Sequence, residues 1–153
     1  MKNSRQMFVL WLTLTIIALA GVVAIAASTN TVTTTRVSGQ NIKIVRVLWH
    51  DNDTTAAGTD QLVTIDGFIN QVITTPHVSS TIQPQDNYDV YLYHGNDTTL
   101  SLLGTNLENR DTANTEIYAL TTPVYARTVT VSHVNSSVLN ATGAVDIYVT
   151  PTR

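Results

Sequence analysis

The chain has 153 residues, a formal net charge of −3 and a pI near 5.7, so it lacks the basic balance expected of a nucleic-acid-binding protein. Charged residues make up only 12% of it, and it has no cysteine, which excludes disulfides, iron–sulfur clusters and thiolate zinc sites. Threonine, present 26 times, supplies much of the polar character, and its branched Cβ favours strands.

The first element is an uncharged apolar run from Met7 to Ala27, preceded by Lys2 and Arg5. As a helix rising about 1.5 Å per residue, it would span roughly 31 Å, the thickness of a bilayer's hydrocarbon core. We predict one N-terminal hydrophobic α-helix in residues 1–27, retained as a membrane or assembly-core helix; the alternative is a signal peptide cut after Ala24-Ile25-Ala26. Its apolar surface consists of Phe8, Leu10, Trp11, Leu12, Ile16, Ile17, Leu19, Val22, Val23 and Ile25.

Residues 28–39 are rich in threonine, which predicts a linker or an initial edge strand. Residues 40–153 show short apolar–polar alternations between turn signals, which predict a β domain. The predicted strands are Ile42–Trp49, Gln61–Asp66, Phe68–Thr74, Tyr88–His94, Leu100–Leu103, Thr115–Leu120, Arg127–Val134 and a last strand carrying Val145, Ile147 and Val149. About eight such strands indicate an all-β fold, an antiparallel β-sandwich of jelly-roll or immunoglobulin-like type.

Alternation also predicts which side chains face the core. Inward positions are Val90, Leu92, Val129, Val131, Val145, Ile147 and Val149, and the Asp66-Gly67 dipeptide predicts a hairpin turn. Asp89, Tyr91, Tyr93, Asp146 and Tyr148 point outward. Because outward aromatic side chains with few charges suit a protein interface, we predict that Tyr91, Tyr93 and Tyr148 contact another subunit.

The sequence from Leu48 to Thr55 matches that from Leu92 to Thr99 at six of eight positions, and each copy closes a strong strand. If the two loops met, imidazole and carboxylate groups would gather into a metal site, although solvated turns are the favoured interpretation. The candidate metal ligands are His50, Asp51, Asp53, His94 and Asp97.

Other chemistry has little support in the sequence. No Gly-x-Ser-x-Gly elbow or phosphate-binding glycine loop occurs, and neither His77 nor His133 has an evident acid and nucleophile beside it. We predict no enzyme activity, no cofactor and no small-molecule substrate. Asn-x-Ser/Thr sequons in predicted loops are glycosylation acceptors if the protein is exported to a compartment that glycosylates; they begin at Asn52, Asn96, Asn135 and Asn140.

A series of short motifs follows in order through the body of the chain. They are Ile44–Trp49, Gly67-Phe68-Ile69 with Val72-Ile73 and Pro76, Asn87–Val90 with Leu92, Leu103-Gly104, Asn109–Ala113, Pro123-Val124, Thr128–Val131 and Gly143–Val149. In this order and spacing, the body resembles small virion-associated proteins of tailed bacteriophages. The resemblance implies a compact β domain in a viral particle or surface assembly, with no catalytic residues.

These observations lead to one predicted function and two alternatives. The favoured function is a non-enzymatic structural subunit of a virion or surface assembly, with its β domain outside the cytoplasm and its N-terminal helix in lipid. Its partners would be copies of itself, membrane lipid and other virion or surface proteins, but not nucleic acid. The alternatives are a pilin-like filament subunit and a secreted adhesive or carbohydrate-binding module.

Overall fold

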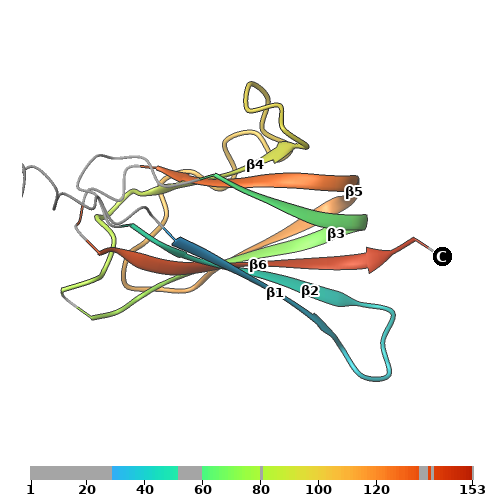
Figure 1. Ribbon diagram of the computed structural model, residues 1–153, viewed down its shortest axis with the longest axis horizontal. Helices are drawn as coiled ribbons and strands as arrows, with labels where there is room; N and C mark the ends of the chain where they lie inside the picture. The colour runs from blue at the N-terminus through green and yellow to red at the C-terminus, as the bar shows by residue number, and fades with distance from the viewer. Residues whose placement is uncertain (1–28, 52–59, 80, 135–137, 139, 153) are drawn as a thin grey trace, which may run out of the picture.

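The computed structural model describes residues 29–51, 60–79, 81–134, 138 and 140–152. These residues form six strands and no helix, so none of them builds an apolar helix long enough to cross a bilayer (Figure 1). The strands are β1 (Thr29–Arg36), β2 (Lys43–His50), β3 (Gln61–Pro76), β4 (Asp89–His94), β5 (Glu116–Val134) and β6 (Thr142–Pro151).

All six strands belong to one antiparallel sheet, in the order β1-β2-β6-β3-β5-β4. The prediction of an all-β, antiparallel fold is therefore confirmed for the described part of the chain. The sequence left residues 28–39 open between linker and edge strand, and Thr29–Arg36 forms the edge strand β1. The predicted N-terminal helix lies outside the described residues.

The Asp66-Gly67 dipeptide forms a corner in β3, so the prediction of a hairpin turn is wrong. Both halves of β3 pair with β5 instead of with each other. Figure 1 shows β3 and β5 turning back together at this corner, which brings β4 and the adjoining parts of β3 and β5 over β6. Asp66 has a φ of 45°, and a Cβ at Gly67 would lie 2.5 Å from the Thr150 carbonyl oxygen, so glycine is required there.

Two further predictions about strands differ from the structure. The predicted pairs of strands on either side of Asp66-Gly67 and in Thr115–Val134 are single long strands, β3 and β5, with bulges. Leu100–Leu103 is not a strand but makes one bridge, between Ser101 and Tyr93. Leu103 and Leu107 are buried in the core, so the leucines of this loop anchor it in addition to its backbone hydrogen bonds.

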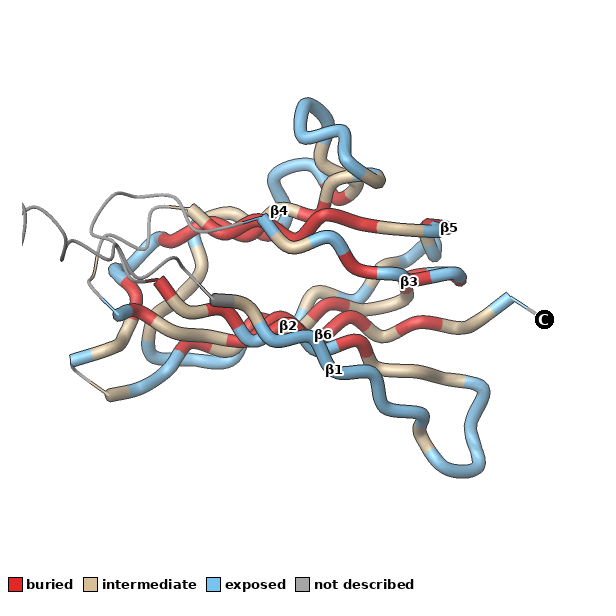
Figure 2. The backbone as a smooth tube through the Cα atoms, viewed as in Figure 1, coloured by how far each residue is buried: buried red, intermediate tan, exposed pale blue. Residues whose placement is uncertain are grey.

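The core lies between the two parts of the bent sheet, where Figure 2 shows buried positions alternating with exposed ones. The inward positions predicted from alternation are confirmed, because each is at most 2% exposed: Val90, Leu92, Val129, Val131, Val145, Ile147 and Val149. The Trp49 ring lies 5.8 Å from that of Tyr88 and 4.3 Å from that of His133. Trp49 on β2 therefore contacts β5 and the residue that precedes β4 across the core.

Candidate functional site

The candidate metal ligands that the structure describes, His50, Asp51, His94 and Asp97, do not form a cluster. His94 pairs with Val129, whereas Asp51 contacts His133, four residues further along β5 and about 14 Å away at about 3.4 Å per residue. The Asp97 carboxylate accepts hydrogen bonds from the amide and hydroxyl of Thr99, as in an ordinary turn. Among the residues that the structure describes, no three His, Asp or Glu side chains are grouped to hold a metal, and Asp53 lies outside them.

The structure instead places Asp51 against His133 inside the core. The Nε2 atom of His133 lies 2.7 Å from Oδ1 of Asp51, and both side chains are at most 2% exposed. Trp49 stacks on the His133 imidazole at an interplanar angle of 21°. This hydrogen bond fixes the end of β2 to the end of β5, and it is a structural contact that sequence reasoning missed.

The internal sequence match does not correspond to equivalent structure. Leu48 is 44% exposed and its neighbour Trp49 is buried, whereas Leu92 is buried and its neighbour Tyr93 faces outward. Because side chains alternate with period two along a strand, the two copies present opposite faces to the core. The described parts of the two copies therefore end strands that are oriented differently toward the core.

The three predicted interface tyrosines lie on two separate strands. Tyr91 and Tyr93 stack on each other on β4, with ring centroids 5.6 Å apart. Desolvation, aided by the charge of Asp89, raises the pKa of the Tyr91 phenol to about 12. Tyr148 lies on β6, separated from β4 by β3 and β5. The structure therefore does not bring the three rings together.

Tyr148 belongs to a broad face of the sheet that points away from the core, here called the outer face. Its members are cross-strand neighbours on β1, β2, β6, β3 and β5, so their side chains share one side of the sheet. They are Thr31, Thr33, Thr35, Ile44, Arg46, Leu48, Gln71, Ile73, Thr75, Ile117, Ala119, Ala144, Asp146 and Tyr148.

The charges of the outer face neutralise each other. The Arg46 guanidinium donates from Nε and Nη2 to the two carboxylate oxygens of Asp146, at 2.6 and 2.7 Å. Hydrogen bonding to Asp146 and its negative charge raise the pKa of Arg46. The other members of the face are aliphatic, aromatic, threonine or glutamine side chains. The result is a five-strand surface without net charge.

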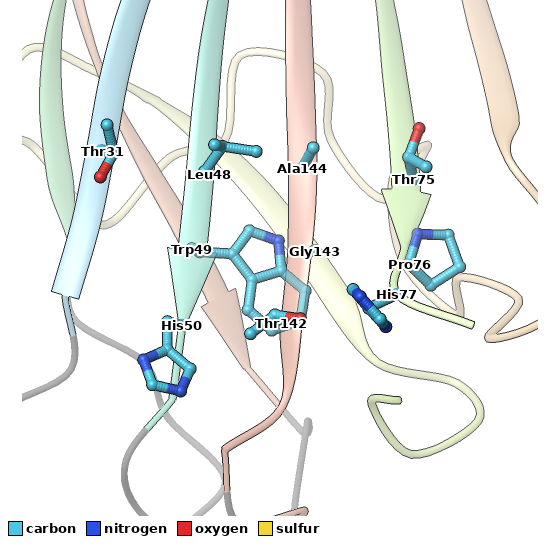
Figure 3. Close-up of a pocket in the computed structure, with 10 residues that line it drawn as sticks. All are labelled: Thr31, Leu48, Trp49, His50, Thr75, Pro76, His77, Thr142, Gly143 and Ala144. Carbon is cyan, nitrogen blue, oxygen red and sulfur yellow. The ribbon is translucent and has the colours of Figure 1, made fainter. Parts of the chain in front are cut away.

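Two hollows open on this face. One, of about 250 Å³, is bordered by the Arg46–Asp146 pair and Tyr148. The larger, of about 390 Å³, lies at the end of the face, where His50 and His77 stand on either side of Thr142 (Figure 3). Leu48, Ala144 and Thr75 form its upper part. The outer face is thus an uneven surface of aliphatic, aromatic and uncharged polar side chains around one ion pair, able to receive complementary side chains.

The signal for the outer face is present in the strand Ile42–Trp49. Its inward residues Val45 and Val47 alternate with Ile44 and Leu48, so both faces of the strand carry apolar side chains. Strands with two apolar faces are typical of sheets covered on both sides. This strand therefore indicated the outer face more directly than the tyrosines did.

Of the predicted glycosylation acceptors, Asn96 and Asn140 are exposed, while Asn52 and Asn135 lie outside the described residues. Comparison of the chain with protein-family models, curated proteins and solved structures found no match. The resemblance to virion proteins of tailed bacteriophages therefore stays a prediction.

Proposed function

We propose that this chain is a non-enzymatic structural subunit that assembles with copies of itself through the outer face. The observation that carries the proposal is the lack of net charge on that face, where Arg46 and Asp146 pair with each other. Leu48 and Ile117 are 44% and 65% exposed on the same surface. The cores of protein interfaces are depleted of charged residues, and burying this surface would remove apolar area from water.

A second copy is the partner that this surface fits. Two identical faces without net charge meet without like-charge repulsion, and twofold contacts between identical patches are the commonest way in which soluble subunits assemble. The face carries two hollows, and the exposed Leu48 of another copy can pack into one of them.

The assembly acts at a membrane in this proposal. The apolar run Met7–Ala27 forms a retained helix in lipid or between copies, and the bent sheet works as a β-sandwich outside the cytoplasm. The run ends two residues before β1 begins, so the anchor and the sheet are joined almost directly. A virion with a lipid layer and a cell-surface appendage both have this layout.

The test introduces a charge on the outer face. In the Leu48→Glu variant, assembly would bury a carboxylate without a partner, so the dissociation constant should rise at least about a hundredfold. Sedimentation velocity of the full chain in detergent measures this change, and thermal unfolding shows whether the variant folds.

Leu62→Glu is the matched control, because Leu62 is 47% exposed but lies on the half of β3 outside the outer face. This variant should assemble like the unmodified chain. Equal assembly of the Leu48→Glu and unmodified chains would refute the outer face as the contact. A monomeric unmodified chain would instead favour a binding module that uses the larger hollow.

A further inference from the structure

Within the described part of the chain, the outer edge of β1 is uncovered, and the strand is suited to pairing. It has one neighbour, β2, and no described strand lies along its other edge. Residues 31–36 are all exposed, as Figure 2 shows, and Arg36 is the only charge in a strand without proline. Proteins usually protect exposed edges with lysine, proline, bulges or covering loops, because bare edges pair with other strands.

We propose that β1 pairs antiparallel with β1 of a second copy, so that the two sheets become one continuous sheet across a twofold axis. This inference rests on the proposed function, since it names a second contact through which the copies assemble. It adds backbone hydrogen bonds to the contact between outer faces.

The opposite edge of the sheet shows that this chain covers edges elsewhere. The loop after β4 lies along that strand and bonds to its backbone: the Leu102 amide donates to the Leu92 carbonyl at 2.7 Å, and the Val90 amide donates to the Leu107 carbonyl at 3.0 Å. At β1, the described residues provide no comparable cover. The difference between the two edges points to β1 as an edge kept open for a partner.

The register of β1 on β2 identifies the backbone groups that face outward. The Val37 amide donates to the Ile42 carbonyl, which makes 37 and 42 a hydrogen-bonded pair. Such pairs alternate along an antiparallel ladder, so the odd-numbered residues of β1 bond to β2. The amides and carbonyls of Val32, Thr34 and Arg36 therefore point to the open edge.

These outward groups fit a twofold axis at Thr33. Val32 of each copy then forms hydrogen-bonded pairs with Thr34 of the other, and Thr33 faces its own copy in a non-hydrogen-bonded pair. Thr31 lies opposite Thr35, so threonine side chains meet along the outer face. Each Arg36 lies opposite Asn30, which keeps the two guanidinium groups at opposite ends of the pairing.

The place of β1 in the chain favours a second copy over another occupant. The uncharged run of Met7–Ala27 directly precedes β1, so copies held together by this run have their β1 strands close to one another. Such tethering raises the effective concentration of one edge near the next. Pairing there would also extend the outer face, because Thr31, Thr33 and Thr35 belong to both surfaces.

Cysteine cross-linking tests the pairing, because the natural chain contains no cysteine. Full chains carrying Thr33→Cys, embedded in lipid vesicles and mildly oxidised, should form disulfide dimers, since Cβ atoms of a non-hydrogen-bonded pair lie within about 5.5 Å. A mixture of Thr31→Cys and Thr35→Cys chains should cross-link at least fivefold more than Thr31→Cys chains alone. Leu100→Cys, at a 74% exposed loop position, is the control and should form no disulfide dimer.

A backbone variant provides the second arm. Thr34→Pro removes an amide that points to the open edge and leaves the ladder with β2 complete. In the Thr33→Cys background it should lower the yield of dimer at least fivefold, whereas Thr34→Val should not.

The outcomes separate this inference from the proposed function. If the chain assembles but Thr33→Cys fails to cross-link, or if Thr31→Cys chains cross-link with each other as well as the mixture does, edge pairing as described is wrong and the proposed function stands. If the unmodified chain is monomeric in lipid, both are wrong.

Discussion

The hydrogen bond between Asp51 and His133 joins residues 82 positions apart in the chain. Both side chains are buried, and Trp49 covers the imidazole. A polar group in such a place is stable only while its partner is present, because the protein interior offers no water to replace it. The hydrogen bond therefore holds the end of β2 against the end of β5.

Asp51→Ala should destabilise the domain by about 1–3 kcal/mol, since it leaves the His133 imidazole without this acceptor. Urea unfolding followed by circular dichroism measures the change. Asp97→Ala, in an exposed turn, is the control and should have a much smaller effect. Equal losses in the two variants would mean that the buried pair has no special role.

At the residue scale, the sequence predicts burial better than it predicts contacts. Val129, Val131 and Ile147 are buried as the alternation requires, because facing is a local property of each strand. The contact between Asp51 and His133 depends on how distant parts of a bent sheet meet. No local pattern contains that information, so the sequence does not connect His133 with Asp51.

At the element scale, the loop between β4 and β5 is a structural part of the sheet. Its amides and carbonyls bond to the edge of β4, and Leu107 is buried beneath it. Leu107→Ala should cost about 2–5 kcal/mol through lost burial and the cavity left behind. Denaturant unfolding provides the measurement.

Leu100→Ala is the matched control for this loop. Leu100 is 74% exposed, so its truncation should change stability by less than about 0.5 kcal/mol. If Leu107→Ala were equally mild, the loop would not be packed into the core as described.

The sequence predicts where strands lie but not how they continue or pair. The Asp66-Gly67 dipeptide allows positive φ and close backbone approach, and both a hairpin turn and a corner need these properties. The choice between them depends on β5, which pairs with both halves of β3. Partner strands distant in sequence therefore decide what a local turn signal becomes.

At the scale of the whole molecule, the sheet has an apolar inner side and an outer face without net charge. The inner side closes the core through residues such as Trp49 and Val145, while the outer face remains accessible around the Arg46–Asp146 pair. Of the three tyrosines predicted to contact another subunit, Tyr148 alone belongs to this face. The residues of the outer face could not be predicted from the sequence, because predicting them requires the order of the strands in the sheet.

The central claim is that copies of this chain assemble through the outer face. Electron cryo-microscopy of the full chain in lipid vesicles tests it most directly. The account predicts ordered oligomers in which Leu48 and Ile73 of neighbouring copies are buried against one another. Separate β domains whose outer faces are open to solvent would contradict it.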